Sequence, residues 1–196
     1  SSSTMLSAVY SKTMNRNLSG FEALATIPAT IGGAIKNNAS AFNQTIFDNL
    51  EYIKVFDGKK SRKIYKDKIE YAYHKTNITN CIILSAKFNL KGENKYVLHT
   101  KFLNYQKTRL NKQPKEFSCG SIFQNPENQF AGELIEKCGL KGLTQNDAQI
   151  SDIHANFIIN NGNARFEDII YLINLCKEKV FNKFKIKLEE EVEIIK

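Results

Sequence analysis

The sequence lacks the features that mark membrane and secreted proteins. It contains no run of about 18 apolar residues, which excludes a conventional membrane-spanning helix. Its first residues, SSSTMLSAVYSK, have neither the basic segment nor the continuous apolar core of a secretory signal. We therefore expect a cytoplasmic protein that does not contact a membrane.

Cysteine is sparse, and its spacing disfavours two further classes of protein. The four cysteines, Cys81, Cys119, Cys138 and Cys176, are widely separated. No two of them form a C-x-x-C pair, and none stands at zinc-ligand spacing from a histidine. We therefore expect no disulfide framework and no metal site. Cys138 and Cys176 fall on apolar helical faces, where a small buried thiol is the simplest interpretation.

Arginine is scarce too, although the chain is basic. Only four of the 28 Lys and Arg residues are arginine, and the formal net charge is +8. This charge permits an anionic partner such as a nucleotide, a phosphosugar or a nucleic acid. The densest run, KKSRKIYKDK (59–68), favours a solvated hairpin between two strands, with a nucleic-acid patch as the alternative. Because the aromatic residues do not alternate with the lysines, we expect no nucleic-acid partner.

The hydrophobic pattern predicts a mixture of helices and strands. Helical spacing of apolar residues predicts helices around Met5–Tyr10, over 130–142 and from Asn163, as the cap, to Phe184. Runs rich in β-branched and aromatic residues predict strands at 50–60, 81–90 and 154–162, and a last strand at VEII. Helices and strands do not alternate strictly, so the fold class is α+β. A shift in composition near residue 115 indicates a domain boundary.

Three stretches stand out chemically. Residues 21–43, FEALATIPATIGGAIKNNASAFN, combine proline, paired glycines and almost no charge, which is typical of backbone that closely approaches a ligand or another segment. In CGSIFQNP (119–126), a serine follows a Cys-Gly pair just before an amphipathic segment. A cluster of glutamates precedes VEII. These features alone do not identify a reaction.

Four segments resemble the UDP-N-acetylenolpyruvoylglucosamine reductase family, flavoenzymes that make UDP-N-acetylmuramate for bacterial peptidoglycan. They are GFEALATIPATIGGAIKNNASAF, RLNKQPKEFSCGSIFQNP, FAGELIEKCGLKG with SDIHANFIINNGNA, and KLEEEVEII. They follow the family order at compatible spacing from residue 20 onward. The short gap after GSIFQNP is similar to that of the shorter, second type of the family. No segment matches the family's Gly-rich N-terminal flavin-binding subdomain, so we expect a fragment or a divergent relative.

The resemblance implies two domains and an oxidoreductase activity. Residues 1–112 would be part of an α+β flavin-binding domain, and residues 113–196 a smaller α+β substrate-binding domain whose last strand could return to the first. The implied cofactors are FAD and NADPH, and the implied substrate is UDP-N-acetylglucosamine enolpyruvate, with roles in cell wall biogenesis, cell shape and cell division. We expect a monomer that binds FAD poorly or not at all. The alternative is a non-catalytic UDP-sugar or nucleotide-binding domain.

The resemblance also implies catalytic residues. Ser121 matches the general acid that protonates C2 of the substrate after hydride reaches C3, although its position also suits a helix cap. Glu191 matches a glutamate that stabilises the enolic intermediate, while Glu189, Glu190 and Glu193 are expected to face solvent. His74 stands where the family has an arginine, and it carries less charge at neutral pH.

Binding residues are implied in the same way. For the flavin, the resemblance indicates five residues of the 21–43 segment: Glu22, Pro28, Gly32, Gly33 and Asn38. For the substrate, it indicates Tyr73, Lys112, Asn125 and His154. A tight packing turn is the alternative for the first group, and ordinary surface or structural roles are the alternative for the second. No metal ligand is implied.

Overall fold

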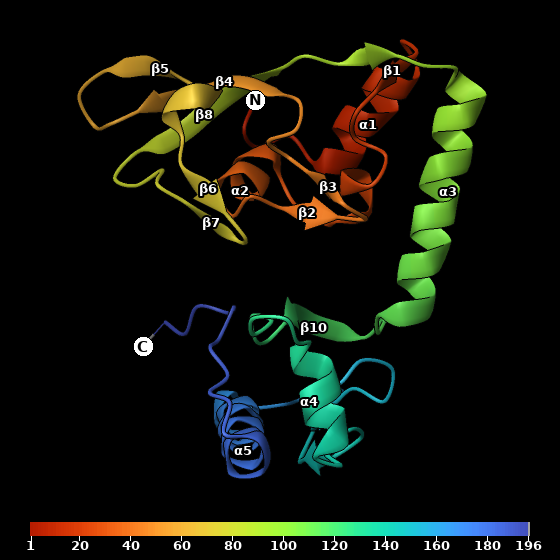
Figure 1. Cartoon of the computed structure of the whole chain (residues 1–196), viewed down its shortest axis with the longest axis vertical. Coiled ribbons are helices and arrows are strands. Elements are labelled where there is room, and N and C mark those ends of the chain that lie inside the picture. Colours follow the sequence, from red (N-terminus) through yellow and green to blue (C-terminus); the bar gives the residue numbers. More distant parts are fainter. Residues whose placement is uncertain (196) are drawn as a thin grey trace. The chain divides into compact units, whose positions relative to one another are not determined.

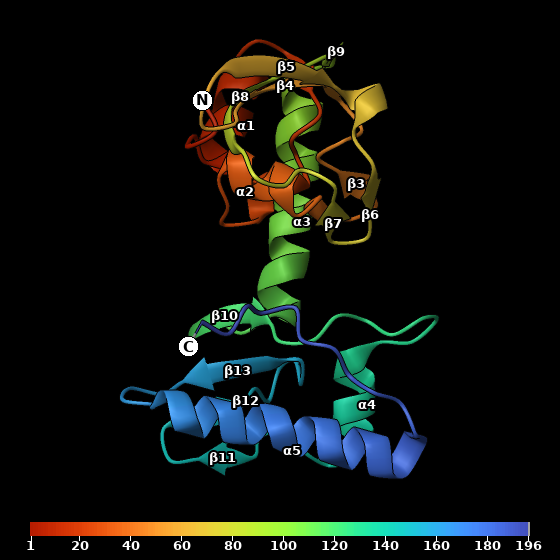
Figure 2. The same ribbon diagram turned by 90° about the vertical axis from the view of Figure 1, so that its left-hand side faces the viewer.

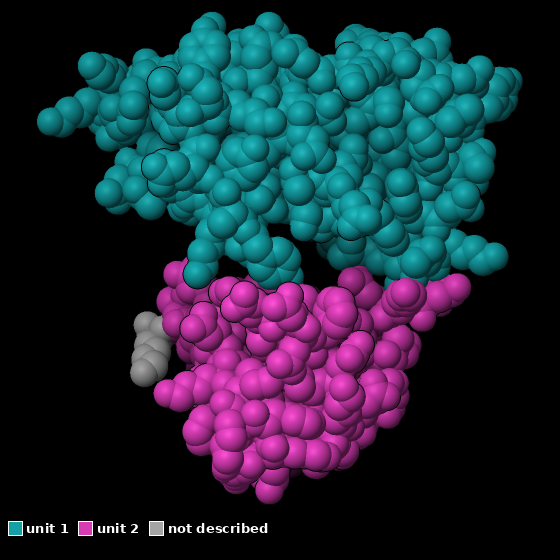
Figure 3. Space-filling view, in the orientation of Figure 1, with its two compact units in different colours: residues 1–109 teal, residues 110–196 magenta. Residues whose placement is uncertain are grey.

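The protein forms two compact units, Ser1–Arg109 and Leu110–Lys196, which Figure 3 colours separately. The structure, a computed structural model, describes residues 1–195. Each unit combines helices and strands around a hydrophobic core of its own. The predicted α+β class is therefore confirmed. Among residues 1–195, none of the helices has the length and apolarity needed to cross a bilayer.

The largest sheet of the first unit has three antiparallel strands (Figure 1). Strand β4 (Leu50–Phe56) lies between β5 (Ser61–Tyr65) and β8 (Ile82–Phe88). Successive side chains of a strand point to opposite faces, and β4 accordingly buries Ile53 and Val55. Helices α1 (Leu6–Met14) and α2 (Ile31–Lys36) add their apolar residues to this core. The predicted N-terminal helix and the strands at 50–60 and 81–90 are confirmed.

The other elements of the first unit are short. They are β1 (Leu18–Ser19), η1 (Leu24–Thr26), β2 (Ser40–Ala41), β3 (Gln44–Thr45), η2 (Lys66–Lys68), β6 (Tyr71–Ala72), β7 (Lys75–Thr76) and β9 (Lys91–Gly92). The strands pair as β1 with β9, β2 with β3 and β6 with β7, each antiparallel. The segment 21–43 thus folds as η1, α2 and the start of a small hairpin.

The basic run 59–68 belongs to the hairpin between β4 and β5. Asp57 closes its turn, because one carboxylate oxygen accepts the N–H groups of Lys59 and Lys60, both at 3.0 Å. These two hydrogen bonds lower the pKa of Asp57. The residues of β5 are exposed except Ile64, which is half-buried. The solvated-hairpin prediction is therefore confirmed.

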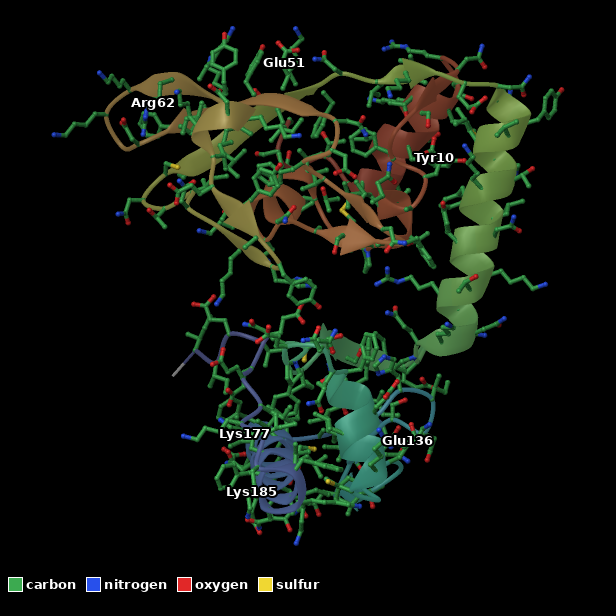
Figure 4. All side chains as sticks on the ribbon, in the orientation of Figure 1. Tyr10, Glu51, Arg62, Glu136, Lys177 and Lys185 are labelled. Carbon is green, nitrogen blue, oxygen red and sulfur yellow. The ribbon has the colours of Figure 1, made fainter. Side chains whose placement is uncertain are left out.

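Helix α3 (Lys95–Lys112) was not predicted from the sequence. Its 18 residues bury only Leu98, so the apolar stripe is too narrow to give a clear helical period. Tyr10 attaches it to α1: the phenol oxygen donates to the carbonyl of Leu98 at 3.4 Å, and the ring stacks on Phe102 at 4.5 Å (Figure 4). A few contacts at its N-terminal half therefore hold a mostly polar helix.

The second unit is a four-stranded antiparallel sheet covered by a long helix (Figure 2). Its strands, in spatial order, are β10 (Phe117–Ser121), β13 (Phe157–Asn160), β12 (Ala148–Ile150) and β11 (Thr144–Gln145). Helix α5 (Phe166–Phe184) packs on β12 and β11, and α4 (Ala131–Lys137) packs beside α5. The predicted helices at 130–142 and 163–184 and the strand at 154–162 are confirmed.

Two predicted details of this unit are wrong. The cap of α5 is Arg165, whose N–H donates to the Asp168 carboxylate at 2.9 Å, whereas the N–H of Asn163 donates to Asp147. The segment VEII forms no strand within the described residues, and the tail makes only an isolated bridge between Phe123 and Glu190. The ladder stops there because the next two tail N–H groups converge on one carbonyl, that of Ile122.

Candidate active site

Ser121 ends β10 at a bulge. The register with β13 shifts between Ser118 and Ser121, and Ser121 then pairs with Phe157. Gly120 has φ +86°, a left-handed conformation that favours glycine, so the order Cys-Gly-Ser suits this bend. Bulges often re-aim a side chain beside an active site. The helix-cap alternative for Ser121 is excluded, because α4 begins at Ala131 with Phe130 as its cap residue.

A buried asparagine holds the chain just after Ser121. Asn156 is 3% exposed. Its carboxamide accepts the N–H of Phe123 at 3.0 Å and donates to the carbonyl of Phe123 at 2.8 Å. The backbone carbonyl of Asn156 accepts the N–H of Ile122 at 2.9 Å. The sequence analysis did not single out Asn156. The available signal was its position directly before the apolar run FII, because a polar side chain that is buried with such a run needs a hydrogen-bond partner.

The C-terminal tail brings Glu191 to the same place. The N–H of Gln124 donates to the carbonyl of Glu189 at 2.9 Å, and the N–H of Glu191 donates to the carbonyl of Ile122 at 2.7 Å. The backbone of Glu191 is therefore hydrogen-bonded to the residue that follows Ser121. The structure brings these two predicted catalytic residues together within the second unit.

The neighbouring glutamate is not simply a solvent-facing side chain. Glu190 forms an ion pair with Lys177 of α5 at 2.8 Å, and only 27% of its side chain is exposed (Figure 4). The hydrogen bond from Lys177 lowers the pKa of Glu190. The solvent-facing prediction is wrong for Glu190, because α5 presents an ammonium to it, whereas Glu189 and Glu193 are exposed.

His154 contacts Asn156 and helix α4, which lie beside this site. Its Nδ1 accepts the N–H of Asn156 at 3.2 Å, and its ring lies 5.0 Å from that of Phe157. A Cβ added at Gly132 of α4 would lie 3.0 Å from the imidazole, so α4 packs directly against it. Burial lowers the pKa of His154. The structural interpretation thus has direct contacts in its favour, and substrate binding stays a prediction.

The other two predicted substrate residues of this unit lie near its surface. Lys112 is the exposed last residue of α3. Asn125 is exposed, and its side-chain oxygen accepts the N–H of Ala131 at 3.0 Å. Asn125 therefore helps to start α4. Substrate binding by Asn125 stays a prediction.

In the first unit, three of the predicted residues lie at the β6–β7 hairpin. Tyr73 and His74 are the two loop residues of this hairpin, and their ring centres lie 4.1 Å apart. His74 has φ +53°. The side chain of Asn38 donates to the carbonyl of Ala72 at 2.8 Å. Asn38, a predicted flavin residue, is thus joined to the strand that leads into His74.

Two residues predicted to bind flavin, Glu22 and Gly32, instead make contacts within the fold. Both carboxylate oxygens of buried Glu22 accept the N–H of Gly20, at 3.2 and 3.1 Å. The N–H of Gly32 donates to the carbonyl of Ser2 at 2.8 Å, and a Cβ added at Gly32 would lie 3.0 Å from the Cβ of Ser2. At these two positions the packing-turn alternative explains the residue type.

Pro28 and Gly33 are exposed, and they differ in their surroundings. The N–H of Gly33 donates to the Thr30 hydroxyl at 3.3 Å within the first turn of α2. Pro28 lies between η1 and α2. A Cβ added at Gly33 would lie 3.5 Å from the Thr30 hydroxyl oxygen, which is ordinary contact, so packing does not require glycine there. Pro28 and Gly33 remain predictions for flavin binding.

Asn38 carries the observation that fits a bound cofactor. It is 7% exposed, and among residues 1–195 its Oδ1 is the buried side-chain oxygen for which no hydrogen-bond partner is found. Leaving a buried acceptor unpaired costs roughly 1–3 kcal/mol. A flavin offers ring N–H and ribityl hydroxyl donors that could satisfy it. The residues present therefore fit a flavin at Asn38, but give no such support at Glu22 or Gly32.

Comparison with known proteins identifies the family. Residues 113–195 match the model of the UDP-N-acetylenolpyruvoylglucosamine reductase C-terminal domain. A UDP-N-acetylenolpyruvoylglucosamine reductase from Campylobacter jejuni (strain RM1221) is 42% identical over 192 residues, which cover 98% of this chain and 71% of that protein. This chain belongs to the UDP-N-acetylenolpyruvoylglucosamine reductase family.

Other members of the reductase family agree in sequence and in fold. A relative from Fusobacterium nucleatum is 43% identical over 189 residues, which cover 93% of this chain and 65% of the relative. The crystal structure of the reductase from Thermus caldophilus superposes with a TM-score of 0.88 at 34% identity, over 98% of this chain and 70% of that one. The chain spans between 61 and 65% of the length of three of the curated relatives it matches.

Proposed function

We propose that this chain takes part in the NADPH-dependent reduction of UDP-N-acetylglucosamine enolpyruvate to UDP-N-acetylmuramate, in the cytoplasm, as a step of peptidoglycan synthesis. The observation that carries the proposal is the hydrogen bond between the N–H of Glu191 and the carbonyl of Ile122, which brings the tail to Ser121. The family membership of the chain supports the same reaction, because its relatives bear the name of this reductase.

The two residues would divide the proton chemistry. Reduction of the enol ether adds hydride to C3 and a proton to C2, so the carbon–carbon double bond becomes a single bond. Ser121 would donate that proton and recover one from solvent. A hydroxyl is a weak acid, so it needs a polarising neighbour and a site from which water is excluded. Glu191 would help to stabilise the enolic intermediate through its carboxyl group.

The first unit would serve the cofactor. When bound, FAD supplies the hydride that it receives from NADPH. Asn38 would hold the flavin through its unpaired Oδ1, with Gly33 and Pro28 near it in sequence. His74 would face the intermediate with less charge than an arginine, so we expect weaker stabilisation at this position.

The second unit would serve the substrate. Lys112 would offer an ammonium to the diphosphate, and Asn125 and His154 would offer neutral polar groups. Tyr73 is a further residue that we propose for substrate binding. We infer that residues 1–112 bind the flavin and that residues 113–196 bind the substrate. We also infer that the protein is a monomer whose ligands are small molecules.

A second candidate is a non-catalytic UDP-sugar-binding protein. Two observations favour it. Glu22 and Gly32 form hydrogen bonds within the fold, and His74 stands where the family has an arginine. Under this proposal the chain would bind the UDP-sugar and lack redox activity. A purified protein without flavin absorbance that still binds the substrate in calorimetry would favour it.

The reaction is tested by substrate-dependent NADPH oxidation with Ser121→Ala. The assay uses the chain with FAD added and, in parallel, the chain joined to the part of the Campylobacter relative that it does not cover. We expect Ser121→Ala to lower kcat by roughly 10²- to 10⁴-fold, the usual contribution of a general acid. Ser118→Ala is the matched control, because Ser118 is an exposed serine of the same strand. Equal rates for Ser121→Ala and the parent would exclude the proposed role of Ser121.

A further inference from the structure

We propose that Asn156 is the positioning residue of this site: its side chain fixes the backbone at Phe123 and thereby sets the places of both Ser121 and Glu191. The catalytic part of this inference depends on the proposed function. The geometric part does not, because it concerns hydrogen bonds within the second unit.

The reason lies in the pattern of the bridge between Phe123 and Glu190. In an antiparallel pair of this kind, the residues on either side of the bridged pair make the hydrogen bonds. Here Gln124 donates to Glu189, and Glu191 donates to Ile122. The N–H and C=O of Phe123 itself therefore point away from the tail.

Asn156 occupies the side to which those two groups point. Its carboxamide bonds both of them, at 3.0 and 2.8 Å, and so takes the place of a neighbouring strand. Water is a poor substitute, because Phe123 is 1% exposed and Asn156 is 3% exposed. Buried backbone groups that lose their partners each cost about 1–3 kcal/mol.

The segment Ile122–Phe123 is thus held from both sides. Asn156 bonds it through three hydrogen bonds, and the tail bonds it through the N–H groups of Glu191 and Val192, which both donate to the carbonyl of Ile122. Ser121 is covalently attached to this segment, and Glu191 is hydrogen-bonded to it. A displacement of the segment would move both residues, and misplacement by about 1 Å can cost about 10²-fold in rate.

The geometric part is tested by amide hydrogen exchange in Asn156→Ala. We expect the amides of Phe123 and Glu191 to exchange about 10-fold faster, because the former loses its acceptor and the latter its fixed carbonyl. The amide of Val180, in the middle of α5, should exchange at the parent rate. Asn161→Ala is the matched control, since Asn161 is an exposed asparagine of the same unit that bonds Gln149.

A more conservative variant separates the two bonds of the carboxamide. Asn156→Asp keeps an acceptor for the N–H of Phe123 but loses the donor to its carbonyl, so the amide of Phe123 should stay protected better than in the alanine variant. This variant also provides the test if Asn156→Ala does not fold. Parent exchange rates at Phe123 and Glu191 in the folded variant would overturn the proposal.

The catalytic part is tested by steady-state kinetics of the flavin-loaded protein. We expect Asn156→Ala to lower kcat about 10- to 100-fold with an unchanged KM for NADPH, and Asn156→Asp to recover part of the loss. Faster exchange with a parent kcat would overturn the positioning role. A parent protein without substrate-dependent NADPH oxidation would refute the proposed function instead, while the exchange experiment would still decide the geometry.

Discussion

The two groups of predicted site residues are held in different ways. In the second unit, backbone hydrogen bonds around Ile122 fix Ser121 and Glu191 next to buried side chains. In the first unit, Asn38 and His74 are linked through a short hairpin, by side-chain bonds from Asn38 to Ala72 and from Thr76 to Lys36, each 2.8 Å. The first arrangement is satisfied within the chain, whereas in the second the buried Oδ1 of Asn38 has no hydrogen-bond partner among residues 1–195.

This difference suits the two kinds of chemistry that we propose. An acid that delivers a proton to one carbon atom must be placed accurately before the substrate arrives. A flavin brings many donors and acceptors of its own, so the surface that receives it can leave an acceptor unpaired in its absence. The contrast can be tested by perturbing each unit with matched substitutions.

The largest effects are expected from cavities in the two cores. Leu172→Ala in α5 and Ile53→Ala in β4 each remove a side chain that is 0% exposed. Each should lower the free energy of unfolding by about 2–5 kcal/mol, measured by denaturant titration. Because each unit has its own core, hydrogen exchange should rise mainly in the unit that carries the substitution. Equal increases in both units would show that they unfold together.

An intermediate effect is expected at two glycines with similar backbones. Gly120 and Gly58 have φ +86° and +91°, and a Cβ added at either meets no atom within 4 Å. Replacement by alanine should therefore cost each about 1–2 kcal/mol of backbone strain, seen as a lower Tm. Only Gly120→Ala should also reduce substrate-dependent NADPH oxidation, because Gly120 precedes Ser121. Loss of activity in Gly58→Ala as well would indicate a general effect of stability.

The smallest effect is expected at two ion pairs, and it depends on pH. Lys177 lowers the pKa of Glu190, so this pair stabilises the fold above the unfolded pKa of the carboxyl and is lost as pH falls through the folded pKa. Glu51 raises the pKa of Lys87, so that pair is lost as pH rises through the folded pKa of the ammonium.

Lysine-to-alanine variants separate these two contributions. Lys177→Ala should lower stability at neutral pH by no more than about 0.5–1 kcal/mol, because 39% of the lysine side chain is exposed. Its difference from the parent should vanish in acid, whereas that of Lys87→Ala should vanish in strong alkali. Thermal unfolding as a function of pH measures both. A Lys177→Ala difference that persists below the carboxyl titration would mean that packing, not charge, is responsible.

The sequence was informative where local pattern and chemistry coincide. The stripe of α5 has a clear helical period, and β4 and β8 lie in runs rich in β-branched and aromatic residues, so these elements could be predicted. The narrow apolar stripe of α3 gave no such period. The prediction of a strand at VEII was wrong, because β-propensity does not show whether a tail will find a neighbouring strand to pair with. Glu190 was misjudged because the ammonium beside it comes from Lys177 of α5, which the sequence pattern does not place next to the tail.

Sequence by itself determined the α+β class, helices α1, α4 and α5, strands β4, β8 and β13, and the resemblance that pointed to Ser121 and Glu191. Those properties depend on local spacing and residue type. Only the tertiary structure decided that the carbonyl of Ile122 joins the tail to the serine turn, and that Asn156 completes the backbone of Phe123. These contacts connect residues far apart in the chain, and no local period or propensity records which buried group a distant side chain will satisfy.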